Sequence, residues 1–252
     1  MHLPQELIDK IIGHLPPGHK SLHNPSLVAK AWAYPSQRRL FESVYIMADR
    51  ALESWLVNIS PTNVELLQHV RSLSYLSHLD RGPTALAEFF HDYSFPHLRR
   101  LDLFWGCLPE SLPRIGTFSA FQHTLEHLYL CDCTVSINGL SSLINYFPNL
   151  VHLELDRPLS PVDDQQIPSP LVRPLRKLTV VGTYINNDLG PIGELLELQP
   201  QCDEVSIDMH VLVAPSVIQR VIKGVETSVK HLNLRGGIDC VCNIPKSFRG
   251  SC

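Results

Sequence analysis

A pattern of aliphatic residues, L-x-x-L-x-L, recurs seven times along the chain, with successive copies beginning 25 to 28 residues apart. The alternation L-x-L places two aliphatic side chains on one face of a short strand, so we predict a strand at each copy. Three copies are strong: Leu98-Leu101-Leu103, Leu125-Leu128-Leu130 and Leu150-Leu153-Leu155. Weaker copies are Val70-Leu73-Tyr75, Leu175-Leu178-Val180, Cys202-Val205-Ile207 and Val229-Leu232-Leu234, and Phe41-Val44-Ile46 is a candidate for a further strand.

Segments with the apolar spacing of helices lie between several of these strands, at residues 84–93, 140–147, 189–198 and 215–224. Each strand–helix unit has one apolar side that it cannot bury alone, and stacking the units buries a continuous core. The sequence therefore predicts an α/β fold in which a curved parallel sheet carries outer helices over residues 41–238. This part resembles the longer, helix-containing leucine-rich repeats.

One connection departs from the repeat. Residues 157–174 contain five prolines, and proline removes backbone donors and is costly inside a helix. We predict an irregular surface loop there in place of a helix. Residues 239–252 also lack an amphipathic pattern, and we expect an irregular C-terminal tail without a polar capping repeat.

Residues 1–40 carry no such repeat and instead predict two helices. Leu3-Pro4 suits a helix start, an apolar stripe follows, and Pro16-Pro17-Gly18 ends it. The stripe consists of Leu7, Ile8, Ile11, Ile12 and Leu15. The second helix is expected to carry Leu27, Val28, Ala31 and Trp32 and to end at Tyr34-Pro35.

The stretches LPQELIDKIIGHL and SLVAKAW, followed by a basic segment and LF, resemble the F-box. The resemblance implies a helical module, residues 1–40, that docks on the Skp-type adaptor of an SCF-type cullin–RING ubiquitin ligase and through it on a cullin scaffold. The repeats would then hold an unknown target protein. The implied adaptor-binding residues are Leu3, Pro4, Ile8, Ile11, Leu15, Leu27, Val28 and Trp32.

A plainer interpretation of the same residues stays open. Solenoids need a terminal unit that shields the first repeat, and an amphipathic helix pair can serve that purpose alone. The chain would then be a leucine-rich-repeat interaction scaffold with a helical N-terminal cap and no role in a ubiquitin ligase.

The predicted strands also indicate where a target would bind. In L-x-x-L-x-L-x, the third, fifth and seventh positions point away from the aliphatic core. Over the middle repeats these positions give the target-binding candidates Arg100, Asp102, Phe104, His127, Tyr129, His152, Glu154 and Lys177. Aromatic anchors beside charged groups are typical of binding hot spots, although a merely solvated face requires polar residues too. We expect an acidic or phosphorylated target segment, held more tightly in mild acid if His127 and His152 gain charge.

Composition narrows the function further. The formal net charge is -4 and the basic residues are scattered, which argues against a nucleic-acid protein. The N-terminus does not resemble a signal peptide, no apolar run is long enough to span a membrane, and seven cysteines without secretory context favour a reducing compartment. We therefore expect a cytoplasmic or nuclear protein.

Sequence motifs for catalysis are weak. His123 to His127 match H-x-x-E-H, a zinc-protease signature that needs a helix, whereas this segment overlaps a predicted strand. The pairs Cys131/Cys133 and Cys240/Cys242 lie four repeats apart and are not expected to form one zinc site. We expect a non-catalytic protein that holds no cofactor or metal.

Overall fold

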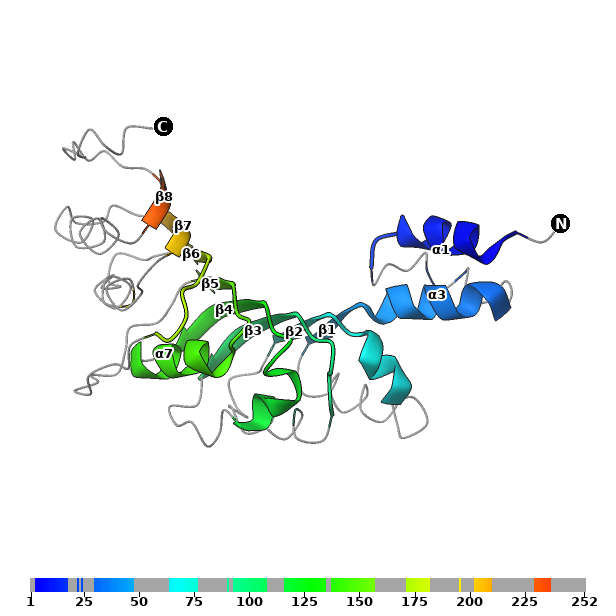
Figure 1. The fold of residues 1–252 in the computed structure, drawn as a ribbon, viewed down its shortest axis with the longest axis horizontal. Helices are drawn as coiled ribbons and strands as arrows, with labels where there is room; N and C mark the ends of the chain where they lie inside the picture. Colours follow the sequence, from blue (N-terminus) through cyan, green and yellow to red (C-terminus); the bar gives the residue numbers. More distant parts are fainter. Residues whose placement is uncertain are drawn as a thin grey trace.

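The computed structural model describes residues 3–17, 22, 24, 30–47, 64–76, 90, 93–107, 116–134, 137–156, 171–181, 195, 202–209 and 229–236. In these parts the chain is an α/β protein whose strands form a single parallel sheet, ordered β1 to β8 along the sequence. Figure 1 shows the strands following a curve, with helices on its outer side. This arrangement is compatible with the predicted curved α/β solenoid.

Every predicted strand is present, including the additional one at Phe41-Val44-Ile46. Strands β1 to β6 begin at the third position of the aliphatic pattern, whereas β7 and β8 begin at its first position. The strands are β1 Ser43–Met47, β2 Ser72–Leu76, β3 Arg100–Cys107, β4 His127–Thr134, β5 His152–Asp156, β6 Lys177–Val181, β7 Cys202–Met209 and β8 Val229–Gly236.

Sheet register follows the repeat spacing. Arg100 pairs with His127, His127 with His152, and His152 with Lys177, so equivalent positions of successive repeats lie side by side. The residue before each of these strands helps to set this alignment: the backbone N–H groups of Glu126 and His127 both donate to the carbonyl of Arg99, at 2.8 and 2.9 Å. The differences in repeat length, from 25 to 28 residues, are therefore accommodated in the connections, while the pairing of equivalent strand positions stays the same.

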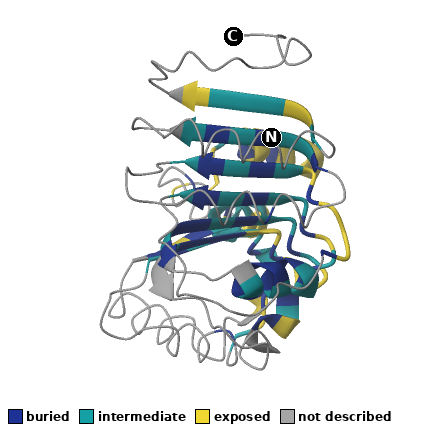
Figure 2. Ribbon diagram, turned by 90° about the vertical axis from the view of Figure 1, so that its left-hand side faces the viewer, coloured by how far each residue is buried: buried dark blue, intermediate teal, exposed yellow. Residues whose placement is uncertain are grey.

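The main core lies between the sheet and the outer elements, which are η2 Val64–His69, η3 Gly116–Phe121 and α7 Ile137–Tyr146. The apolar core positions of β2 to β7 are buried, and most of the positions between them are partly exposed, with Asp102 and Cys131 as buried exceptions (Figure 2). Phenylalanines pack beside them, and the rings of Phe121 and Phe147 stack with centroids 6.0 Å apart. Helix α7 confirms the helical pattern predicted for residues 140–147.

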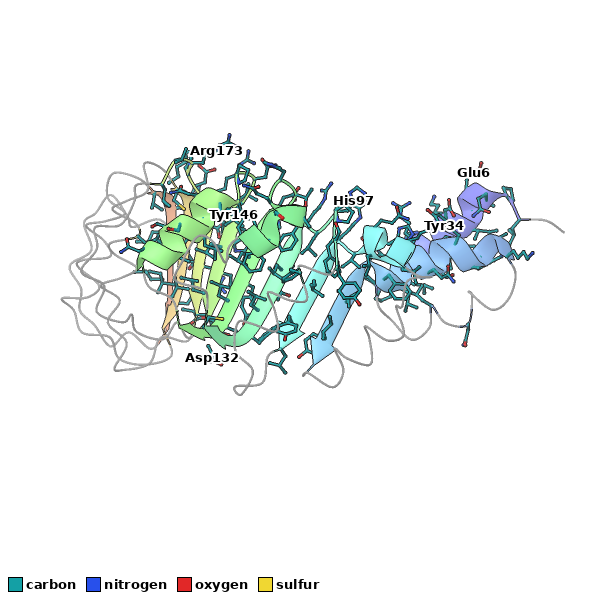
Figure 3. All side chains as sticks on the ribbon, turned by 90° about the horizontal axis from the view of Figure 1, so that it is seen from below. Glu6, Tyr34, His97, Asp132, Tyr146 and Arg173 are labelled. Atoms are coloured by element: carbon teal, nitrogen blue, oxygen red, sulfur yellow. The ribbon has the colours of Figure 1, made fainter. Side chains whose placement is uncertain are left out.

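The N-terminal helical unit consists of α1 Gln5–Gly13, Leu22 and α3 Lys30–Phe41. Its own small core is formed by Ile8, Ile12 and Leu22, with Leu15, Trp32 and Leu40 packed around them. The unit lies at the β1 end of the sheet (Figures 1 and 3), and the Tyr34 ring on α3 packs against His69 of η2. A second, separate core therefore stands beside the core of the sheet.

The predicted end of the second helix at Tyr34-Pro35 is wrong, because α3 continues through Pro35 to Phe41. Proline has no backbone N–H to donate to the carbonyl four residues earlier, which belongs to Ala31. The side-chain amide of Gln5 donates to that carbonyl instead, at 3.3 Å. A contact from α1 thus replaces part of the hydrogen bonding that proline removes.

Several predicted segments lie wholly or mostly outside the described residues. These are the helical patterns at 84–93, 189–198 and 215–224, residues 157–170 of the proline-rich loop and the tail at 239–252. The described end of the loop contacts the neighbouring repeat: the Val172 N–H donates to Asn145 Oδ1 at 2.9 Å and Arg173 Nη1 donates to the carbonyl of Pro148 at 3.0 Å.

Candidate functional site

The inner face is the sheet surface opposite α7. Core leucines of β3 to β6 pack toward the outer elements, so the alternating side chains point the other way. All eight predicted target-binding residues lie on these four strands. The face also includes Ser74, Asp156, Thr179 and Glu204, which make the contacts described below.

Asp102 is the most buried charged residue of the described inner face, with 8% of its surface exposed. Arg100 Nε donates to its Oδ1 at 2.8 Å, and Ser74 Oγ donates to its Oδ2 at 2.8 Å. A buried carboxylate needs such donors to offset the loss of water. Arg100 is therefore an internal partner of Asp102. The sequence pattern predicted an exposed cation at this position, but the ion pair makes Arg100 less available to an anionic ligand.

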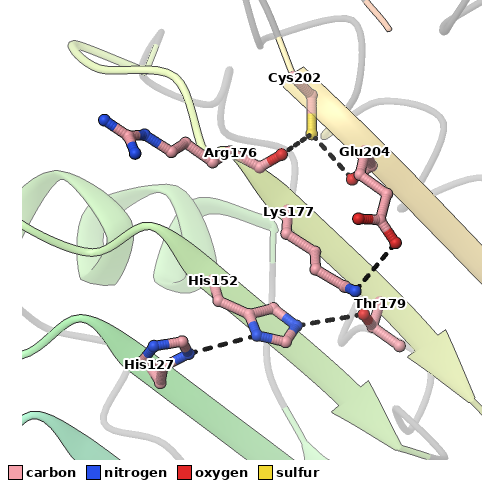
Figure 4. A network of polar contacts seen from close by, with 7 residues as sticks. All are labelled: His127, His152, Arg176, Lys177, Thr179, Cys202 and Glu204. Atoms are coloured by element: carbon pink, nitrogen blue, oxygen red, sulfur yellow. Dashed lines mark hydrogen bonds and ion pairs between the residues drawn. The ribbon is translucent and has the colours of Figure 1, made fainter. Parts of the chain in front are cut away.

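His127 and His152 form a polar chain that crosses β4, β5 and β6. Their Nδ1 atoms are 3.3 Å apart, and His152 Nε2 is 3.2 Å from Thr179 Oγ1 (Figure 4). Burial, then the positive neighbours His127, Lys177 and Arg100, lower the pKa of His152 to about 4. The expectation that both histidines gain charge in mild acid is therefore wrong for His152, because its ring is desolvated.

Lys177, which follows His152 in the same row of equivalent positions, is also paired with a carboxylate. Its Nζ lies 2.8 Å from Glu204 Oε1, with both side chains partly exposed. Arg100 and Lys177, the two permanent cations among the predicted target-binding residues, thus each contact a carboxylate. Glu204 occupies the third position of the next repeat and was predicted to lie on the same face, but the target-binding candidates were taken from the middle repeats only.

An aromatic pair borders this polar chain. The rings of Phe104 and Tyr129 lie edge to face with centroids 5.3 Å apart, and Tyr129 OH donates to Asp156 Oδ2 at 2.8 Å. Burial, reinforced by the Asp156 carboxylate, raises the pKa of the Tyr129 hydroxyl. Burial is also the main cause that raises the pKa of Glu154. The face consequently offers the Tyr129 hydroxyl and the uncharged His152 ring beside aromatic surface.

The predicted adaptor-binding residues that the structure describes are of two kinds, exposed side chains and side chains that belong to or pack against the core of the helical unit. Leu3 and Ile11 are exposed, by 47% and 46%, and Pro4 is exposed at the start of α1. Ile8, at 2% exposure, belongs to the core of the helical unit and cannot contact a partner directly, while Leu15 and Trp32 pack against that core. Leu27 and Val28 lie outside the described residues.

Leu7 was not among the predicted adaptor-binding residues, but it is 47% exposed. It stands four residues before Ile11, a spacing that places both on one side of α1, and Leu3 lies just before the start of the helix. We call Leu3, Leu7 and Ile11 the apolar row. The apolar stripe predicted from the sequence included Ile8 and Ile12 as well as Leu7 and Ile11. Only the packing of the helical unit shows which of these side chains are buried and which are exposed.

The H-x-x-E-H segment has no helix: His123 lies in a turn, His127 begins β4, and Glu126 is 3.4 Å from Arg99 Nη1. This geometry does not provide the two-histidine helix face of a zinc protease. Among the described residues, no group of three or more potential ligands could hold a metal ion. No helix in that part of the chain has the length and apolar character needed to cross a bilayer.

Two surfaces therefore stand out in the described chain, the apolar row on α1 and the inner face of the sheet. Both are suited to contacts with other proteins, one by exposed aliphatic side chains and the other by aromatic and polar groups in register. Comparison of the sequence with models of protein families finds no match, and comparison with curated proteins finds none either. Function is therefore inferred from residues and geometry.

Proposed function

We propose that this protein is a non-catalytic substrate-recognition subunit of an SCF-type ubiquitin ligase. In this proposal the N-terminal helical unit is an F-box that binds a Skp-type adaptor, and the sheet is a leucine-rich-repeat solenoid that binds the target. The chain supplies no bond-making group; it holds the target near the ubiquitin-charged enzyme, and the rate gain comes from proximity. Such a protein acts in the cytoplasm or nucleus.

The observation that carries the proposal is the apolar row. Leu7 and Ile11 on α1, and Leu3 just before the helix, are nearly half exposed, although the same helix has buried Ile8 and Ile12 in its own core. Exposed apolar side chains gathered on one surface are typical of protein-interaction sites. Burying them against a partner recovers hydrophobic free energy of roughly 25 cal/mol per Å².

The inner face supports the second half of the proposal. Equivalent positions lie in register across β3 to β6, so a target could contact several repeats at once. Because Arg100 and Lys177 are paired with carboxylates, recognition there would rely on Phe104, Tyr129 and neutral hydrogen-bonding groups rather than on a row of free cations. This revises the target class from a phosphorylated segment to one with apolar and uncharged polar groups.

The test replaces Leu7 and Ile11 together by aspartate and measures binding of a purified Skp-type adaptor by calorimetry. Charged side chains on the apolar row should weaken binding at least about a hundredfold, since central interface residues contribute about 2 kcal/mol or more each. The matched control is Val172→Asp, because Val172 is also an exposed aliphatic residue, at 79%, but lies beside α7. Absence of adaptor binding by the wild-type protein at micromolar concentration would refute the proposal.

A leucine-rich-repeat scaffold with a helical cap is the second candidate, and one feature favours it. Helix α3 leads into β1 with only Glu42 between them, and the Tyr34 ring packs edge to face on His69 of η2 at 5.6 Å. A cap needs such close packing against the first repeat. The two candidates separate in the same experiment, because a cap binds no adaptor whether or not Leu7 and Ile11 are replaced.

A further inference from the structure

A pocket of about 370 Å³ lies where the N-terminal helical unit meets the first strands. Residues of α1 and α3 form one side, and Glu42 and Arg71, which precede β1 and β2, form the other. The Arg71 N–H donates to the carbonyl of Glu42 at 2.9 Å, so the backbone holds this second side together. None of the residues that line the pocket belongs to the apolar row or to the inner face.

Three arginines line the pocket, and they differ in their contacts. Arg39 is held by Glu42, with which it forms an ion pair, and by the carbonyl of Leu15, to which Nε donates at 2.9 Å. Within the described part of the chain, the side chains of Arg38 and Arg71 make no ion pair or hydrogen bond. The Asp9 carboxylate also lines the pocket, but it already accepts a hydrogen bond from Gln5 Nε2 at 2.9 Å.

His69 lies next to the pocket and is influenced by the same arginines. Its pKa is lowered first by burial and then by the charges of Arg38, His97 and Arg71. The Tyr34 ring, which also lines the pocket, packs on His69, and Figure 3 shows Tyr34 and His97 on the two sides of the junction. The lining thus contains three arginines and two carboxylates, one of which is paired with Arg39, and this excess of positive charge favours the entry of an anion.

We infer that this pocket binds the phosphate group of a small phosphate ester, with Arg38 and Arg71 as its cationic ligands. A guanidinium group matches phosphate oxygens through two parallel N–H donors. Two such groups on different elements can hold one dianion between them. Tyr34 provides an aromatic wall against which an organic part of the ester can pack.

The experiment titrates the full chain with inorganic phosphate and with phenyl phosphate, at constant ionic strength maintained with chloride, and measures affinity by calorimetry. We expect saturable binding in the millimolar range or tighter, with phenyl phosphate bound more tightly than inorganic phosphate. Arg38→Gln and Arg71→Gln should each weaken binding by about tenfold, because each removes charge-assisted hydrogen bonds. Arg173→Gln is the matched control, since it removes one positive charge at a distant loop.

A second readout distinguishes a site from general screening. A bound dianion favours the protonated ring, so phosphate should raise the pKa of His69, measured by the chemical shifts of the ring protons, while chloride should not. Because neither arginine side chain has an internal partner in the described structure, the variants should keep the wild-type melting temperature. Equal effects of phosphate and chloride, or full affinity in both folded arginine variants, would overturn the assignment.

Discussion

At the scale of single residues, the inner face is governed by how far each polar group is removed from water. Asp102 is buried and receives two donors, one from its own strand and one from the neighbouring strand. His152, in contrast, lies between His127 and Thr179 with no carboxylate hydrogen-bonded to its ring in the described structure. Burial therefore opposes its charging, and positive neighbours oppose it further. The charge of this face is thus set by contacts across strands.

Protonation of His152 should make the protein less stable in acid. Its pKa is about 4 in the folded chain and about 6.5 in the unfolded chain, so the unfolded chain binds more protons between these pH values. The contribution to stability is complete above about pH 6.5 and falls as the pH falls toward 4. Urea unfolding at pH 7 and pH 5 should show a smaller loss for His152→Gln than for the wild type.

His123→Gln is the control for this pH effect, because it removes a histidine that lies in a turn outside the polar chain of His127, His152 and Thr179. If His152→Gln and the wild type lose the same free energy of unfolding between pH 7 and pH 5, the neutral state assigned to His152 is wrong.

At the scale of elements, α3 shows how one helix tolerates an internal proline. Pro35 removes one intrahelical hydrogen bond, and its ring crowds the preceding turn. The Gln5 amide reaches the freed carbonyl of Ala31 while also donating to Asp9. Helix α3 is further supported by Trp32 and Leu40, which pack on the core of the helical unit. Packing from α1 therefore outweighs the local cost of proline.

Coupling between Gln5 and Pro35 follows from this contact. Gln5→Ala should destabilise the wild type by about 0.5 kcal/mol, at the low end for a hydrogen bond because the site is exposed. In a Pro35→Ala background the restored backbone N–H at position 35 takes the place of the Gln5 amide, so the same substitution should cost less. A double-mutant cycle measured by urea unfolding gives the difference; additive effects would mean that the contact does not compensate for proline.

At the scale of the whole molecule, the curved sheet is stabilised by neighbours on both sides of each inner strand. The aliphatic positions of β2 to β7 are buried, whereas Leu232 and Leu234 on β8 are only partly buried. In Figure 2 β8 is coloured as intermediate and exposed along its length. Because β8 is the last strand of the described sheet, the same repeat position has a different environment at this end.

Leucine-to-alanine substitutions at equivalent repeat positions should therefore differ in cost. Leu128→Ala in β4 should lower the free energy of unfolding by about 2 to 5 kcal/mol, since it leaves a cavity in a packed core. Leu232→Ala in β8 should cost clearly less, because part of that side chain already contacts water. Denaturant unfolding of both variants measures the difference, and equal costs would show that β8 is covered as fully as β4.

The order and register of the sheet could be predicted from the sequence. The alternation of aliphatic residues marks each strand, and the distance between copies determines which residues become neighbours. The placement of Arg100, His127, His152 and Lys177 in one row followed directly from this spacing. Such features depend on local periodicity, which a single sequence displays.

The charge and accessibility of those residues were decided only by the tertiary structure. Glu204 pairs with Lys177 from the next strand, and the stripe on α1 divides into buried Ile8 and exposed Leu7 according to where the rest of the helical unit packs. Pro35 stays inside a helix because Gln5, distant in sequence, reaches the carbonyl that it leaves free. The pocket between the two cores arises where α3 meets the first strands. These charges and accessibilities depend on burial and on partners that are distant in sequence, and the periodicity of a single sequence does not reveal either.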